Sequence, residues 1–138
     1  MNIMLQTTES YKQKNIKCDY PLERSIYLVN FRDAIGSQQG GIRPALVASN
    51  NTYNKFSPTI TVIPITSKIN KKSPVHVLID ANSLNGLSKD SVIEVEKMRD
   101  INKFQLIKKM GTISVEEERK VAEKFTIQFP MLISLLKN

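Results

Sequence analysis

Arg43 is the residue best placed for chemistry in this chain, because it lies between a flexible polar turn and an apolar segment that starts with proline. The stretch Gly36–Val47 reads GSQQGGIRPALV. Gly40 and Gly41 can take positive φ and let a ligand approach the backbone, and Pro44 biases Arg43 toward extended geometry. A guanidinium stays charged near neutral pH, and its planar donors match phosphate oxygens. The pattern predicts a site for an anionic group, unless Arg43 is solvated or paired with a carboxylate, as many surface arginines are.

Composition limits the partners and cofactors of this chain. Its 138 residues carry a formal net charge of +7, which favours a polyanion such as nucleic acid, a membrane surface or an acidic protein. The single cysteine, Cys18, allows no intrachain disulfide, and one histidine, His76, leaves no His/Cys cluster for structural zinc. No metal or cofactor is expected. Because the sequence shows no signal peptide and no apolar run long enough to cross a bilayer, a cytoplasmic location without a membrane partner is expected.

The segments that must position Arg43 read mainly as short β-strands. Runs rich in β-branched and aromatic residues, bounded by polar turns, are typical of strands. They predict strands at residues 25–31, 45–48, 59–66, 75–79, 91–98 and 110–113. Pro64 suggests that the third of these strands lies at an edge or carries a bulge near its end.

Helical signals are strongest toward the end of the sequence. Ser114 is expected to begin a helix, with Glu117 placed to complete a capping box. The apolar face of this helix is expected to consist of Val115, Val121, Ala122 and Phe125. Residues 101–108 are expected to form one or two helical turns, and residues 50–58 a connection rich in turns.

Together these elements predict one domain of the α+β class, mainly β with a C-terminal helix. Five or six short strands at close spacing favour a small, strongly bent antiparallel barrel. A length of 138 residues suits a single domain with a modest core. Residues 1–22 are polar and weakly periodic, so they are expected to be an N-terminal extension, and residues 23–138 the domain.

Four patterns in the same order along the chain resemble the MazF/PemK toxins of bacterial toxin-antitoxin systems. The family pattern G-S-E-Q-G-G-x-R-P appears at 36–44, and N-x-[FY]-S-P-T appears at 54–59. The strand end I-T-x-x-I appears at 65–69, and D-S-V at 90–92. The resemblance spans about residues 23–129 and implies an SH3-like barrel of the MazF/PemK/CcdB kind. It also implies a homodimer that cleaves single-stranded RNA at short sequences without a metal, and that a cognate antitoxin inhibits.

The resemblance assigns catalytic roles to two residues. Arg43 falls on the arginine that contacts the scissile phosphate, and Thr66 falls on the threonine at the end of the third strand. When a ribose 2′-hydroxyl attacks the adjacent phosphorus, the protein must stabilise a dianion-like phosphorane and manage two proton transfers. Arg43 can stabilise that charge, while Thr66 and its neighbour Ser67 can donate hydrogen bonds to the phosphate or orient the hydroxyl. Without the resemblance, packing would be the simpler explanation of Thr66.

The chain departs from the family pattern at two places that bear on chemistry. Gln38 replaces a glutamate, so a candidate proton acceptor becomes a neutral amide, and Gln38 and Gln39 are expected to assist or to bind RNA. The family segment L-E-Q-I-R reads VEKMR at 95–99. There Lys97 replaces a glutamine that helps to read a base, and Arg99 is kept as a candidate RNA contact. A different sequence preference is therefore expected.

Four further side chains could have a functional role, and each has a simpler explanation as well. Lys68, in the lysine-rich turn after Thr66, could follow an RNA backbone or could simply be solvated. Tyr53 and Phe56 could stack on bases, but one of them is expected in a core or an interface. Histidine side chains often act as general acids or bases, yet His76 is expected to be a packed or surface residue, because the sequence offers it no partner cysteine or histidine.

The leading interpretation is a toxin that acts as an endoribonuclease on messenger RNA. The alternative is a non-catalytic relative, either one that poisons a topoisomerase by protein contact or a remnant that binds RNA or an antitoxin. The presence of both Arg43 and Thr66 favours the enzyme.

Overall fold

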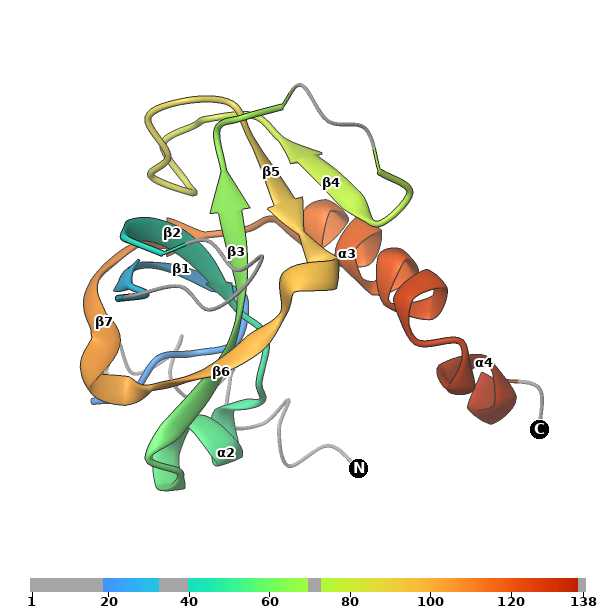
Figure 1. Cartoon of the computed structure of the whole chain (residues 1–138), viewed down its shortest axis with the longest axis horizontal. Coiled ribbons are helices and arrows are strands. Elements are labelled where there is room, and N and C mark those ends of the chain that lie inside the picture. Colours follow the sequence, from blue (N-terminus) through green and yellow to red (C-terminus); the bar gives the residue numbers. More distant parts are fainter. Residues whose placement is uncertain (1–18, 33–39, 70–72, 137–138) are drawn as a thin grey trace.

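An antiparallel β-sheet forms the body of the structure, and the long helix α3 packs against it (Figure 1). The computed structural model describes residues 19–32, 40–69 and 73–136. The strands are β1 (Ser25–Asn30), β2 (Ile42–Val47), β3 (Thr59–Thr66), β4 (His76–Ile79), β5 (Ser91–Glu94), β6 (Arg99–Asn102) and β7 (Leu106–Thr112). The helices are α2 (Asn51–Phe56), α3 (Val115–Gln128) and α4 (Met131–Leu136), and two short 3₁₀ turns are η1 (Val95–Lys97) and η2 (Lys103–Gln105). None of the described helices is both long and apolar enough to cross a membrane.

The sheet is open rather than closed into a barrel. Its strand order is β4-β5-β3-β2-β1-β7, and β6 pairs with the first half of β3. Within the described ranges, the two end strands β4 and β7 do not pair with each other. The prediction of a mainly β chain with a C-terminal helix is confirmed. The predicted barrel is corrected to an open, antiparallel sheet.

Strand β3 is the centre of the sheet. Its first half pairs with β6, its middle with β2, and its last two residues, Ile65 and Thr66, with β5. Pro64 pairs with Ala45 at the point where β3 leaves β2. Of the two alternatives predicted for Pro64, an edge strand or a bulge, the edge strand is therefore wrong, because β3 is an inner strand and Pro64 lies where β3 changes its pairing from β2 to β5.

Two apolar clusters lie on the opposite faces of the sheet, as the alternation of side chains along a strand requires. One contains Val29, Phe31, Ala45, Val47, Ile60, Val62 and Ile101. The other includes Ile26, Leu46, Ile63, Ile65 and Ile93 and is covered by Val121 and Phe125 of α3. Ala45 and Val47 thus face one cluster while Leu46, between them, faces the other.

Helix α3 begins where the sequence indicates. Ser114 Oγ accepts a hydrogen bond from the Glu117 N–H at 3.1 Å, and the Ser114 N–H donates to Glu117 Oε1 at 2.9 Å, which confirms the capping box. Val121 is buried and Phe125 packs on the core, but Val115 is 71% exposed. The assignment of Val115 to the buried face is wrong, because its side chain lines the open pocket between the sheet and α3 that is described below. Ala122 is also exposed, at the rim of a pocket described below.

Replacement of Ser114 by alanine is expected to lower the free energy of unfolding by about 1 kcal/mol, because the Glu117 N–H loses its side-chain acceptor, Ser114 Oγ. Chemical denaturation followed by circular dichroism measures the change. Ser114→Asp is the matched control, since aspartate caps helices equally well. Equal losses in both variants would contradict the capping role.

Three segments differ from the predicted elements. Residues 101–108 form the end of β6, the turn η2 and the start of β7 instead of a helix. The predicted strand 91–98 ends at Glu94 and continues as η1, which turns the chain from β5 toward β6. The connection at 50–58 contains the short helix α2, whose N-cap Asn50 accepts from the Tyr53 N–H at 2.8 Å.

Candidate active site

Arg43 lies at the start of β2, where the chain returns from the loop after β1. The Phe31 N–H donates to Gly41 O and the Gly41 N–H to Arg32 O, and Gly41 has φ +80, the positive value its position was expected to require. Arg43 Nε donates to Gly40 O at 2.9 Å. This bond fixes the plane of the guanidinium and leaves its two terminal nitrogens for a ligand. No carboxylate in the described part of the chain forms an ion pair with Arg43.

Thr66 ends β3 on the neighbouring strand. Continued by two residues, the Ala45–Pro64 register would place Arg43 opposite Thr66. Thr66 is 5% exposed, and its Oγ1 accepts the Lys68 N–H at 3.2 Å, which leaves the hydroxyl hydrogen available to donate. Ser67 follows it and is exposed. The structure thus brings Arg43 and Ser67 to one pocket, described next, whose lining does not include Thr66.

A pocket of about 260 Å³ lies at this point of the sheet, between the start of β2 and the end of β3. Its lining combines two cations, Arg43 and Lys89, with three hydroxyl groups from Ser67, Ser88 and Ser91. The remaining lining residues are apolar, and none of the lining residues is acidic. Such a pocket suits an anion with several oxygen acceptors, which describes a phosphate group.

Sequence reasoning missed the contribution of the segment 87–91 to this pocket. The D-S-V pattern at 90–92 was noted only as a family match, although Ser91 and its neighbours Ser88 and Lys89 line the pocket. Ser91 is 5% exposed, and its hydroxyl donates to Lys89 O at 2.8 Å, which holds the turn that presents Lys89. The signal in the sequence is the serine and lysine that directly precede the D-S-V match.

Arg99 adds a second guanidinium close to Arg43. It lies on β6, opposite Val62 of β3, and its Cζ is 4.3 Å from the centre of the Phe31 ring. Burial and then the positive charge of Arg43 lower the pKa of the Arg99 guanidinium, while Glu94 opposes this shift. Arginine remains a cation in proteins. Two like charges held near each other favour an anionic ligand between or beside them.

The structure does not bring every candidate residue to the pocket. Tyr53 and Phe56 belong to α2, at the beginning of β3, so about 20 Å of strand separates them from Thr66 at its end. The Tyr53 hydroxyl lies 2.7 Å from Thr59 Oγ1, whereas Phe56 is 75% exposed. Lys97 forms an ion pair with the buried Glu94 at 3.2 Å, which offsets its charge.

Gln38 and Gln39, two further candidate contacts to RNA, lie outside the described residues. A third candidate, Lys68, has an exposed side chain and lies two residues beyond Thr66.

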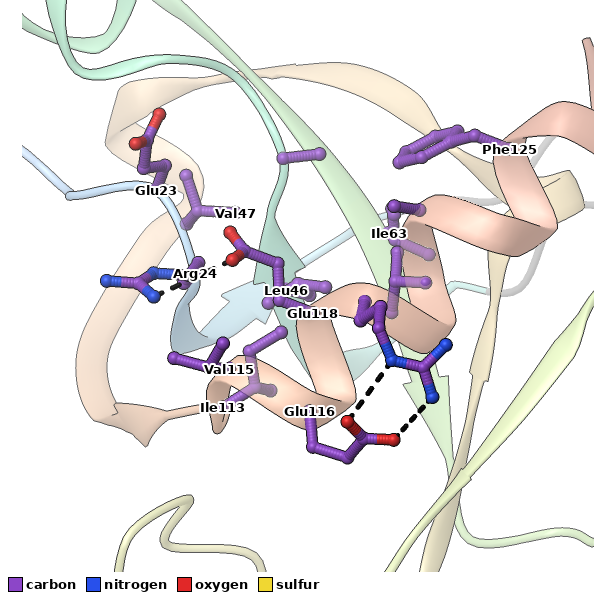
Figure 2. Close-up of a pocket in the computed structure, with 14 residues that line it drawn as sticks. Glu23, Arg24, Leu46, Val47, Ile63, Ile113, Val115, Glu116, Glu118 and Phe125 are labelled. Carbon is purple, nitrogen blue, oxygen red and sulfur yellow. Dashed lines mark hydrogen bonds and ion pairs between the residues drawn. The ribbon is translucent and has the colours of Figure 1, made fainter. Parts of the chain in front are cut away.

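A larger pocket of about 550 Å³ lies between the sheet and α3, and its chemistry is different (Figure 2). Its floor is apolar, with Leu46, Ile63 and Phe125, while glutamates 23, 116 and 118 lie at its rim. Burial and the nearby charge of Glu118 raise the pKa of the Glu23 carboxyl, and Arg24 opposes this shift. Arg24 and Arg119 also line this pocket, but each forms an ion pair with one of these glutamates, so no described cation of the lining is left unpaired for a polyanion. The smaller pocket at Arg43 is therefore the candidate active site.

The open antiparallel sheet with a C-terminal helix is also found in known proteins, and the sequence matches a known family. Residues 23–129 match the family described as PemK-like, MazF-like toxin of type II toxin-antitoxin system, and the chain belongs to this family. Endoribonuclease EndoA of Bacillus subtilis strain 168 is 41% identical over 108 residues, which cover 78% of this chain and 92% of EndoA.

Solved structures show the same fold. The crystal structure of MazF (Form-I) from Deinococcus radiodurans has a TM-score of 0.69 at 24% identity, covering 88% of this chain and 100% of that chain. An endoribonuclease in complex with its cognate antitoxin from a mycobacterial species has a TM-score of 0.63 at 18% identity, covering 80% of this chain and 95% of that chain.

Proposed function

We propose that this protein is the toxin of a toxin-antitoxin system and acts as a sequence-specific, metal-independent endoribonuclease on single-stranded messenger RNA. The observation that carries the proposal is the pocket at Arg43, which offers cations and hydroxyl donors and no acidic lining residue. Family membership and the similarity to an endoribonuclease support the same activity. They do not favour the non-catalytic alternative, in which the fold would act only by binding a protein or an RNA.

The reaction that fits these groups is attack of a ribose 2′-hydroxyl on the adjacent phosphorus. The O2′–P bond forms and the bond from phosphorus to the 5′-oxygen of the next nucleotide breaks, leaving a 2′,3′-cyclic phosphate and a 5′-hydroxyl. Negative charge builds up on the non-bridging oxygens, where donors fixed in advance stabilise the transition state most strongly. We assign this role to the terminal nitrogens of Arg43 and to the hydroxyl of Thr66, with Ser67 as a second donor.

Around this centre, other residues supply affinity for the RNA chain. Lys89 and Arg99 add positive charge near the pocket, which strengthens binding to phosphates independently of sequence. We expect Lys68 to follow the RNA backbone beyond Ser67, and Gln38 and Gln39, which precede Gly40 in the sequence, to contribute neutral amides. Lys97, in place of the glutamine of the family pattern, and the aromatic residues Tyr53 and Phe56 are proposed as more distant RNA contacts.

We further propose that the protein works in the cytoplasm as a homodimer and that a cognate antitoxin inhibits it. The similar mycobacterial structure holds an endoribonuclease together with its antitoxin, which supports this pairing. Residues 23–138 would form the toxin domain, and residues 1–22 an extension that precedes it.

Incubation of the purified protein with a long single-stranded RNA in excess EDTA tests the activity. Discrete fragments that end in a 2′,3′-cyclic phosphate are expected, because the proposed reaction uses no metal. A single 2′-deoxy substitution at a mapped cut site should leave that site intact while other sites are still cut. Intact RNA with the wild-type protein would refute the proposed function, and continued cutting at the 2′-deoxy site would refute the mechanism.

A further inference from the structure

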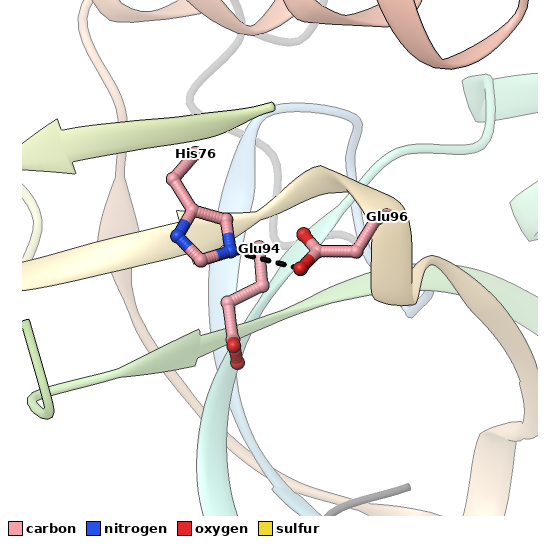
Figure 3. A group of neighbouring side chains, drawn as sticks. All are labelled: His76, Glu94 and Glu96. Carbon is pink, nitrogen blue, oxygen red and sulfur yellow. Dashed lines mark hydrogen bonds and ion pairs between the residues drawn. The ribbon is translucent and has the colours of Figure 1, made fainter. Parts of the chain in front are cut away.

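Three side chains with oxygen or nitrogen ligand atoms meet at the corner between β4, β5 and η1. His76 begins β4, Glu94 ends β5 directly opposite it, and Glu96 lies in η1. His76 Nε2 is 2.8 Å from Glu96 Oε2, and one ligand atom of each residue lies within 4.8 Å of the others. Figure 3 shows the Glu94 side chain below and between the imidazole and Glu96.

This cluster contains buried polar atoms without partners. The Glu94 side chain is only 6% exposed, yet its Oε1 has no hydrogen-bond partner in the part of the chain that the structure describes. His76 Nδ1 is likewise buried and unpartnered. An unsatisfied buried group is costly, above all a charged one, and natural structures contain few of them without a reason. A ligand bound to Glu94 would remove that cost.

We propose that His76, Glu94 and Glu96 form a binding site for a divalent transition-metal ion of the zinc type. One imidazole and two carboxylates are ligands that such ions take, whereas magnesium prefers oxygen ligands and retains its water. Two ligands at about 2.1 Å from a tetrahedral ion lie about 3.4 Å apart, so rotations of the side chains suffice to close the present separations. Water would fill the fourth position.

Lys97 is the natural competitor for this ion. Its Nζ lies 3.2 Å from Glu94 Oε2 and already supplies one positive charge to the carboxylate. The ammonium contacts Oε2, which leaves Oε1 free for the metal. Removal of the Lys97 charge should therefore tighten metal binding, while removal of the Glu94 or His76 ligand should weaken it. A structural ion pair without a metal site does not predict these opposite effects.

The site is independent of RNA cleavage as proposed above, which takes place at Arg43 without a metal. A metal held here would tie β4, the end of β5 and η1 together. It would bind the folded chain only, so it should raise the melting temperature in proportion to the logarithm of its concentration.

Zinc titration of the full chain, against a chromophoric chelator and by isothermal calorimetry, tests this site. All proteins carry Cys18→Ser, so that the lone thiol does not bind zinc. We expect one zinc per chain, at least tenfold weaker binding in Glu94→Gln and in His76→Gln, and tighter binding in Lys97→Gln. Glu123→Gln, an exposed acid on α3, is the matched control and should bind as the parent does.

A magnesium control and a third ligand variant test whether the site is specific for zinc and whether its carboxylates bind the ion. Magnesium at the same concentrations should neither displace zinc nor raise the melting temperature. Glu96→Gln, whose side chain is more exposed than that of Glu94, provides a third ligand variant if Glu94→Gln fails to fold. The absence of zinc binding, or unchanged affinity in the ligand variants that fold, would overturn the proposal.

Discussion

Arg43→Ala is expected to reduce RNA cleavage about 10²- to 10³-fold or more while the protein remains folded. The loss corresponds to one fixed donor at the charge that develops on the phosphate. Arg43 is only half-buried, and the one described hydrogen bond of its side chain is to Gly40 O, so its replacement should cost little stability. Single-turnover cleavage of a fluorescent RNA, measured with circular dichroism as a check of folding, gives the result.

Two further variants separate the charge of Arg43 from its shape. Arg43→Lys keeps the charge but loses the planar fork, so it should recover RNA binding more than the rate of cleavage. Arg119→Ala removes an exposed arginine of α3 that pairs with Glu116, and it should cleave as the wild type does. Wild-type rates in folded Arg43→Ala would show that another group stabilises the phosphate.

Gly86→Ala is expected to destabilise the protein by about 3 kcal/mol or more, through backbone strain and overpacking together. Gly86 has φ +70, and a Cβ at this position would lie 2.1 Å from Met110 O, on β7. The main chain of the loop before β5 must therefore move away from β7. Because Leu87, Ser88 and Lys89 follow in the same loop and line the pocket, cleavage should fall as well. Denaturant unfolding measures the stability.

Gly41→Ala is the matched control for this change. Gly41 also has positive φ, at +80, but a Cβ there would meet nothing within 4 Å. Gly41→Ala should therefore lower the free energy of unfolding only by the cost of placing alanine at positive φ, about 1–2 kcal/mol. Equal destabilisation by the two substitutions would show that conformation alone, rather than contact with β7, accounts for Gly86.

Local patterns predicted the strands that are continuous and apolar but not the elements that distant pairing creates. The run at 59–66 was placed correctly, because its β-branched residues are buried by neighbours on both sides. Ile101, Phe104 and Ile107 have a spacing that resembles a helical face, yet Ile101 is buried on β6, whereas Phe104 and Ile107 are exposed. Partners far away in sequence, β3 and β1, decide that outcome, and a local window does not contain them.

The sequence likewise indicated some residues of the candidate site and not others. Arg43 and Thr66 were proposed from residue types and from the family patterns, and of the two Arg43 lines the pocket. Lys89 was not, because its position depends on the close approach of the loop to β7 at Gly86. His76 was set aside for lack of a second histidine or a cysteine, but the β4–β5 register brings two glutamates to it. Such a pairing is fixed by the sheet rather than by any spacing in the sequence.

The pairing of the first strand with the last has a consequence for synthesis on the ribosome. β1 acquires its outer neighbour only when β7 is present, and the loop that carries Lys89 rests against β7 at Gly86. A growing chain therefore cannot assemble the pocket until Thr112, the end of β7, has emerged. Translation of most of the message would therefore precede completion of the proposed site, and an incomplete chain is expected to leave the RNA from which it is made uncut.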